Sequence, residues 1–155
     1  SLNGDHPRLI IPFFDKENVF FGYQGRAFGK ENPKYITIML KEKNKIFGLD
    51  RINSNQHIFV VEGPIDSLFL DNCLAVAGAD FKLDMDEKDY TVIYDNEPRN
   101  VEIIKRMEKS IEQNQSIVIW PDNIEEKDIN DMILSGKTSV EIHRIISKNT
   151  FSNLH

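Results

Sequence analysis

The sequence has little of what several protein classes require. It contains one cysteine in 155 residues, Cys73, which excludes an internal disulfide and a cysteine-based zinc site. A chain so poor in cysteine indicates a reducing cytosol as its compartment. No segment approaches the roughly 18 uninterrupted apolar residues of a membrane span, and no signal peptide is recognisable. With 40% hydrophobic and 28% charged residues, the composition is that of a globular domain, which excludes a disordered tail or a collagen-like chain.

Each part of the chain carries an excess of one sign of charge. The formal net charge is −6, but residues 1–56 carry nine Lys/Arg against six Asp/Glu, a balance of +3. Residues 57–155 carry ten against nineteen, a balance of −9. Such a division favours a basic surface for a polyanion beside an acidic pocket that needs cations. The alternative is ordinary unevenness of surface charge.

The first third of the chain has the pattern of short strands. Apolar segments at residues 9–14 and 19–23 flank a polar turn and predict a hairpin, and residues 35–40 predict a further strand. The polar stretch 41–55 then separates this region from the rest. We expect two parts, a small basic subdomain of mixed strands at residues 1–56 and a second domain at residues 57–155.

Beyond residue 56, short apolar strands alternate with helices. The expected strands are 57–61, 73–77, 91–94 and 116–120, and the expected helices are 64–71, 97–114, 128–135 and 138–147. This alternation is typical of βαβ units, so we predict an α/β fold with a mainly parallel sheet flanked by helices. In such folds functional groups collect at the carboxyl ends of the strands.

Carboxylates follow several of these strand ends. Glu62 ends the first strand, Asp95 and Glu97 straddle the end of the third, and Asp128 and Asp131 follow the fourth. Residues i and i+2 of an extended chain point the same way. Oxygen ligands without His or Cys suit Mg²⁺ or Mn²⁺, and two such ions about 4 Å apart promote phosphoryl transfer. The alternative is that these acids only begin helices, where they favour the helix dipole.

The residues next to Glu62 have their own interpretation. Gly63 predicts a sharp backbone turn with room for a ligand beside Glu62. Pro64 fits the first turn of a helix, and Asp66 is interpreted as a first-turn helix acid.

Two motifs resemble the TOPRIM (topoisomerase–primase) domain. They are an acid–glycine pair ending one strand and a spaced acid pair ending a later one, here Glu62-Gly63 and Asp95-Asn96-Glu97. Upstream motifs are similar to the basic subdomain of bacterial and phage DNA primases, namely residues 11–15, 22–27 and 33–35. Residues 127–131 resemble the K-D-x-x-D/E segment of the same enzymes. The ordered series spans about residues 8–135 and resembles the catalytic core of phage-type primases, close to the T-even-like ones.

The resemblance implies metal-dependent synthesis of short RNA primers from ribonucleoside triphosphates on single-stranded DNA. Glu62 would orient or hold the metal, Asp95 and Glu97 would ligate it, and Asp128 with Asp131 would complete the acidic site. Two ions of Mg²⁺ or Mn²⁺ are expected. A replicative helicase would be the partner of the full-length protein, in the cytosol of a bacterium or phage-infected host, with no membrane involved.

The basic subdomain would meet phosphates. The resemblance assigns triphosphate or template phosphates to Arg26, as a planar fork, and to Lys34, as a point charge. Tyr23, Phe28 and Tyr35 could stack on bases, although packing in the core is the favoured interpretation for each.

Two departures from the family pattern bear on activity. Most TOPRIM proteins have Asp-x-Asp where this chain has Asp95-Asn96-Glu97, which we interpret as a variant metal site. The zinc-binding module of complete primases cannot be built from one cysteine, so we expect a truncated core that is weakly active or inactive alone. The alternatives are another TOPRIM enzyme such as a nuclease, or a non-catalytic module that binds DNA or a replisome partner.

Overall fold

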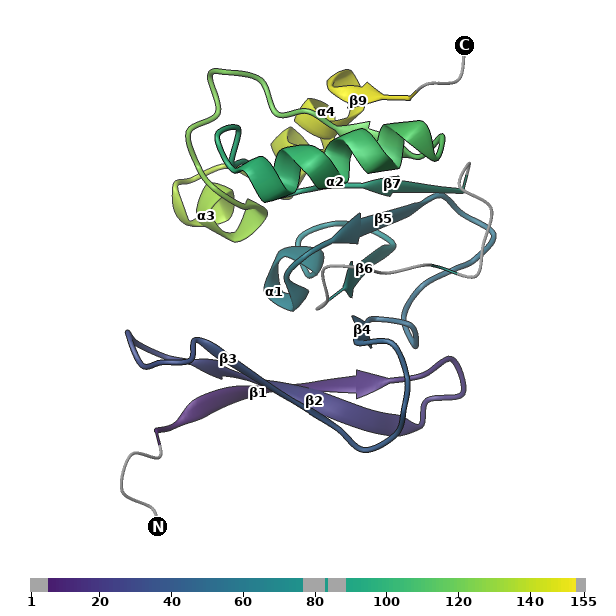
Figure 1. Cartoon of the computed structure of the whole chain (residues 1–155), viewed down its shortest axis with the longest axis vertical. Helices are drawn as coiled ribbons and strands as arrows, with labels where there is room; N and C mark the ends of the chain where they lie inside the picture. The colour runs from purple at the N-terminus through teal and green to yellow at the C-terminus, as the bar shows by residue number, and fades with distance from the viewer. Residues whose placement is uncertain (1–5, 77–82, 84–88, 153–155) are drawn as a thin grey trace.

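Two β-sheets of different type make up the structure, a computed structural model that describes residues 6–76, 83 and 89–152 (Figure 1). The small sheet consists of β1 (Arg8–Phe14), β2 (Phe20–Ala27) and β3 (Tyr35–Met39), all antiparallel. The predicted hairpin and third strand are therefore confirmed. A register shift between Phe13 and Phe14 bends β1 beside its turn.

The large sheet has six strands in the order β4-β6-β5-β7-β8-β9. Its four inner strands run parallel, and the short strands β4 and β9 pair antiparallel at the two edges. The α/β fold with a mainly parallel sheet is confirmed. The strand bounds are β4 Ile46–Phe47, β5 Ile58–Val61, β6 Cys73–Val76, β7 Tyr90–Val92, β8 Ser116–Val118 and β9 Thr150–Phe151.

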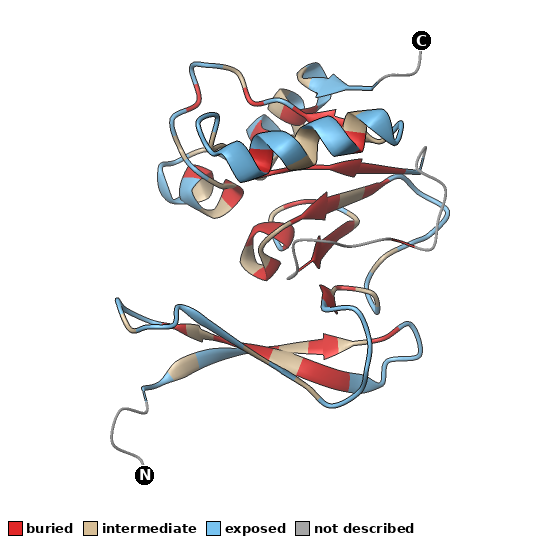
Figure 2. Ribbon diagram, viewed as in Figure 1, coloured by how far each residue is buried: buried red, intermediate tan, exposed pale blue. Residues whose placement is uncertain are grey.

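Helices cover both faces of this sheet (Figure 1). Their bounds are α1 Pro64–Ser67, α2 Val101–Glu112, α3 Ile129–Leu134 and α4 Ser139–Lys148. Val60 and Ile117 pack with Ile103 of α2 on one face. Val61 and Val118 pack with residues of α3 and α4 on the other. Burial of both faces explains why these strands are continuous apolar runs rather than alternating ones (Figure 2).

Several bounds differ from the expected ones. The helix predicted for residues 97–114 begins only at Val101, because the Asn100 side chain accepts hydrogen bonds from the backbone N–H groups of Glu102 and Ile103 and so caps the helix there. The helix predicted for residues 64–71 is a single turn. The edge strands β4 and β9 were not predicted, since two residues carry too little pattern. The expected end of the strand 73–77 lies outside the described residues.

An aromatic contact joins the two sheets. The Phe13 ring of β1 is fully buried and lies with its centroid 6.5 Å from that of Phe47 in β4. Phe21 of β2 packs against Phe13 at 5.9 Å. β4 thus belongs to the large sheet by hydrogen bonding while it contacts the small one. The division of the chain at residue 56 stays a prediction.

Candidate active site

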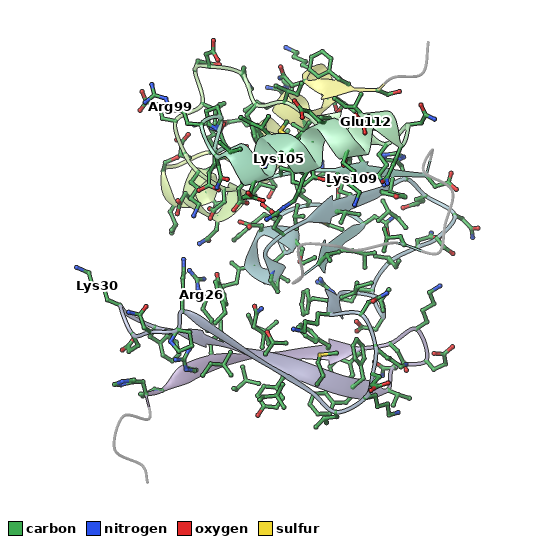
Figure 3. All side chains as sticks on the ribbon, in the orientation of Figure 1. Arg26, Lys30, Arg99, Lys105, Lys109 and Glu112 are labelled. Atoms are coloured by element: carbon green, nitrogen blue, oxygen red, sulfur yellow. The ribbon has the colours of Figure 1, made fainter. Side chains whose placement is uncertain are left out.

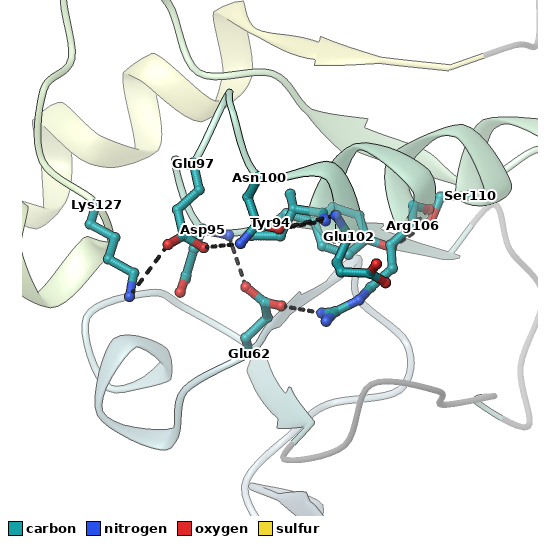
Figure 4. Close-up of polar contacts among 10 residues, drawn as sticks. Glu62, Tyr94, Asp95, Glu97, Asn100, Glu102, Arg106, Ser110 and Lys127 are labelled. Atoms are coloured by element: carbon teal, nitrogen blue, oxygen red, sulfur yellow. Dashed lines mark hydrogen bonds and ion pairs between the residues drawn. The ribbon is translucent and has the colours of Figure 1, made fainter. Parts of the chain in front are cut away.

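Glu62 is held at both carboxylate oxygens (Figure 4). It follows β5, and its Oε2 accepts a hydrogen bond of 3.0 Å from the backbone N–H of Asp95, just beyond β7. Its Oε1 lies 2.8 Å from Nη1 of Arg106 in α2. The pairing of β5 with β7 places these two strand ends side by side. The structure therefore brings Glu62 and Asp95 together, as the sequence predicts.

Glu97 faces a cation rather than the other acids. Its Oε1 lies 3.5 Å from Nζ of Lys127, and its Oε2 accepts a hydrogen bond of 3.3 Å from Nδ2 of Asn100 (Figure 4). The charge of Glu97 is the main reason that the pKa of Lys127 is raised. Because α2 begins after Asn100, the alternative that Asp95 and Glu97 form the first turn of this helix is wrong.

Asp66 is an acid of this site that sequence reasoning assigned to a plain helix turn. Its side chain is buried, and its Oδ1 accepts a hydrogen bond of 2.7 Å from the backbone N–H of Asn130. Burial, with smaller contributions from the charges of Asp128 and Asp131, raises the pKa of Asp66 to about 6. The available signal was its spacing of four residues from Glu62, which places both near the same strand end.

Gly63 makes room for this acid. The chain bends at Glu62 between β5 and α1, but the φ of −108° and ψ of 132° at Gly63 are ordinary extended backbone, so this turn does not depend on a glycine. A Cβ at Gly63 would lie 2.7 Å from Oδ2 of Asp66. The space beside the glycine, expected to hold a ligand, is occupied by a carboxylate of the site.

The Asp95 carboxyl is crowded by other acids. Its side chain lines a small cavity together with Asp66 and Asp128, between apolar walls such as Trp120. Burial raises the pKa of Asp95 to about 8, and the charges of Glu62, Asp66 and Asp128 add to the effect. Within the described residues no donor makes a hydrogen bond to this carboxylate. The site thus concentrates carboxyl groups, and burial among them favours the protonated form of Asp95.

A cleft between the two sheets joins the acids to the basic residues. Arg26, Lys34 and Tyr35 of the small sheet form one wall, and the opposite wall is formed by Asp66, Lys127, Asp128, Asn130 and Asp131. In Figure 3, Arg26 rises from the small sheet toward the large one. The cations also lie against the Tyr35 ring, with Nζ of Lys34 5.5 Å and Cζ of Arg26 6.0 Å from its centroid. Opposite charges therefore face one another across the cleft.

The cleft volume limits what it can enclose. It is about 90 Å³, far below the roughly 300–1,000 Å³ of pockets that enclose a drug-sized ligand. Only part of a nucleotide, such as phosphate groups, fits inside it.

Asp128 also caps α3, since its Oδ1 accepts a 2.8 Å hydrogen bond from the backbone N–H of Asp131.

The acids fit a divalent cation by chemistry but do not form a preassembled ligand set. In the part of the chain that the structure describes, no three Asp, Glu, His or Cys side chains are arranged to hold a metal ion. Asp66, Asp95 and Asp128 nevertheless line one cavity, and carboxylates crowded in this way suit a hard dication. The metal ligation by Glu62, Asp95, Glu97, Asp128 and Asp131 stays a prediction.

No protein-family model matches the chain. The chain is 38% identical over 154 residues to the DNA primase of Enterobacteria phage T4. The alignment covers 96% of this chain but only 45% of the phage protein. Among the described residues, no helix has the length and apolar character needed to cross a membrane.

Solved primase structures share this fold. The DnaG primase catalytic domain bound to single-stranded DNA superposes with a TM-score of 0.70 at 17% identity, covering 95% of this chain and 53% of that one. The primase of Aquifex aeolicus superposes with a TM-score of 0.66 at 21% identity, covering 94% of this chain and 41% of that one. The resemblance to phage-type primases is thereby confirmed: the chain is similar to part of the T4 DNA primase and has the fold of a primase catalytic core.

Proposed function

We propose that this chain is the part of a DNA primase catalytic core that holds divalent metal and nucleotide phosphates during RNA primer synthesis on single-stranded DNA. The observation that carries the proposal is the cleft in which Arg26 and Lys34 face Asp66 and Asp128, within a primase fold. Ribonucleoside triphosphates would be the substrates. Because the chain spans less than half of its phage relative, it would make primers poorly or not at all alone.

Each wall of the cleft has its own task. The guanidinium of Arg26 would bind a phosphate through two N–H groups, and Lys34 would add a point charge. Tyr35, 40% exposed and flanked by both cations, offers a face for a base. These contacts would hold a triphosphate or a template phosphate against the acidic wall.

The acids of the site would hold Mg²⁺ or Mn²⁺, two ions as predicted. Asp95 and Asp128, with Glu97, Asp131 and the added Asp66, would supply the oxygen ligands, and Glu62 would orient the site. When bound, such an ion supplies positive charge that neutralises phosphate oxygens and lowers the barrier to phosphoryl transfer. In the complete protein the partner would be a replicative helicase, in the cytosol of the bacterial host.

Binding of Mn²⁺ to this chain, followed by electron paramagnetic resonance, tests the metal part of the proposal. We expect Asp95→Asn and Asp128→Asn each to weaken binding by about tenfold or more, since each removes a carboxylate ligand. Glu112→Gln, an exposed acid on α2, is the matched control and should bind as the unmodified chain does (Figure 3). Unchanged affinity in Asp95→Asn would contradict the assignment.

Labelled single strands distinguish the reactions. In the presence of Mn²⁺ and ribonucleotides, extension supports the primase, whereas shortening of the strand supports a nuclease. Strand binding that ignores metal and survives Asp95→Asn indicates a non-catalytic binding module.

A further inference from the structure

The shortest polar contact of the Glu62 carboxylate comes from a residue far away in the sequence. Arg106 lies 44 positions further along the chain, in the second turn of α2, and its Nη1 is 2.8 Å from Oε1 of Glu62. The side chains are 34% and 28% exposed, so water competes only in part for this charge-assisted hydrogen bond. Figure 4 shows the guanidinium directed at the carboxylate.

Arg106 determines which way the Glu62 carboxylate faces. With Oε1 on the guanidinium, Oε2 is directed to the backbone N–H of Asp95 at 3.0 Å. Two donors from different elements therefore fix the orientation of one carboxylate. The segment that carries Asp95 is in turn bound to the end of β5 through Glu62.

Arg106 is itself anchored by the residue before Asp95. The hydroxyl of Tyr94 donates a hydrogen bond to the backbone carbonyl of Arg106 at 3.3 Å and lies 2.7 Å from Oγ of Ser110. Tyr94 is only 7% exposed, so these contacts are made away from water. The contacts form a closed ring that runs from Tyr94 to Arg106, to Glu62, to Asp95 and back along the chain to Tyr94.

We propose that Arg106 is a positioning residue for the metal and phosphate site, which it serves by holding Glu62 against the Asp95 amide. This inference rests on the proposed function. In this role Arg106 acts through its contact with Glu62. Without it, Glu62 loses its only cationic partner among the described residues and is repelled by neighbouring acids. The Asp95 segment would then be held less firmly in the geometry that the site requires.

The amide proton of Asp95 reports this role directly. We expect Arg106→Met, which keeps the length of the side chain and removes its charge, to move the Asp95 amide resonance and to speed its hydrogen exchange. Arg106→Lys should restore both in part, because an ammonium can still bind Glu62. Lys105→Met, an exposed cation on the same helix, is the control and should leave the Asp95 amide unchanged (Figure 3).

The single tryptophan reports the fold independently. Nε1 of Trp120 donates a 2.9 Å hydrogen bond to the backbone carbonyl of Tyr94, so its indole resonance shows whether the strand ends are intact. It should stay in place in every variant. If Arg106→Met loses this indole resonance, Arg106→Lys is compared with Lys105→Met instead. The Asp95 amide should then shift in Arg106→Lys, by less than is expected for Arg106→Met, and should not shift in Lys105→Met.

Mn²⁺ affinity of the same variants measures the consequence for the site. We expect Arg106→Met to bind about tenfold more weakly and Lys105→Met to bind normally. An unchanged Asp95 amide, or a shifted amide with unchanged Mn²⁺ affinity, overturns the positioning role. An unmodified chain that binds no Mn²⁺ overturns the proposed function instead, and the Asp95 amide then decides alone whether Arg106 positions Glu62.

Discussion

Asp95 is an example of a residue placed for chemistry at the expense of stability. Its carboxyl is desolvated among other acids, which raises its pKa to about 8 from 3.8. A folded-state pKa above the unfolded value means that the native state binds the proton more tightly. The free energy of unfolding therefore falls as the pH rises from about 4 toward 8, because over this range folding must take up a proton that the unfolded chain has already released.

Asp95→Asn should accordingly stabilise the metal-free protein at neutral pH. We expect a gain on the order of 2 kcal/mol at pH 7, with allowance for the partial exposure of the group, and almost none at pH 4. Urea denaturation at the two pH values measures this. Glu112→Gln should show no such pH-dependent gain, and a loss of stability in Asp95→Asn at pH 7 would contradict the electrostatic account.

Gly63 gives a second prediction for a single residue. The backbone there would accept alanine, but the added Cβ would meet Oδ2 of Asp66 at 2.7 Å. Since Asp66 is buried and bound to the Asn130 amide, its carboxylate has to move and that hydrogen bond is strained or lost. We expect Gly63→Ala to lower the free energy of unfolding by about 1–3 kcal/mol.

The matched control for Gly63→Ala is Gly29→Ala. A Cβ at Gly29 would meet the carboxylate of Glu31 at 3.1 Å, which is not buried and accepts a local hydrogen bond from the Gly29 N–H. Denaturation of both variants, with the Asn130 amide resonance as a local probe, separates crowding of Asp66 from a general effect of alanine. Equal stability of the two variants would remove the explanation given for Gly63.

At the scale of elements, the segment between β8 and α4 is stabilised by hydrogen bonds between its own side chains. The Glu126 carboxylate accepts hydrogen bonds from Oγ of Ser135 at 2.7 Å and from Nζ of Lys137 at 3.0 Å. These contacts, the Ser135 hydrogen bond first, lower the pKa of Glu126 to about 2 from 4.5. They fix the loop that presents Lys127 and Asp128 to the cleft.

The sign of this pKa shift predicts the pH dependence. A lowered folded-state pKa contributes stability that is present above about pH 4.5 and lost as the pH falls toward 2. We expect Glu126→Gln to lower the thermal midpoint at pH 7 and to leave it nearly unchanged near pH 2. Glu125→Gln, an exposed neighbour, serves for comparison, and equal effects at both pH values would exclude the carboxylate as the cause.

At the scale of the whole molecule, the cleft lies where the two sheets meet, with Arg26 and Lys34 on one side and Asp66 and Asp128 on the other. Arg26→Gln and Lys34→Gln should each weaken binding of single-stranded DNA or inorganic triphosphate and make it less sensitive to salt, since each removes a phosphate contact. Titration at several salt concentrations measures both. Lys105→Met, far from the cleft on α2, should change neither, and equal weakening in that variant would indicate non-specific attraction.

The sequence alone predicts the class of the fold and the approach of Glu62 to the Asp95 segment. Apolar runs such as 58–61 predict strands buried on both faces, because parallel sheets are covered by helices on each side. Glu62 and Asp95 follow strand ends, and parallel strands bring their carboxyl ends to one edge. Patterns of this kind depend on residues close together along the chain, so they can be recognised from the sequence alone.

Tertiary structure decided which partner each of these acids has. Asp66 became part of the site because α1 packs against α3 and buries its carboxylate beside Asn130. Arg106 reached Glu62 because α2 packs on the large sheet, where its Ile103 shares a core cluster with Val60 of β5, and the two residues in contact are 44 positions apart. Side-chain pairing, burial and the resulting pKa shifts depend on distances across the fold, and no periodicity along one strand or helix contains them.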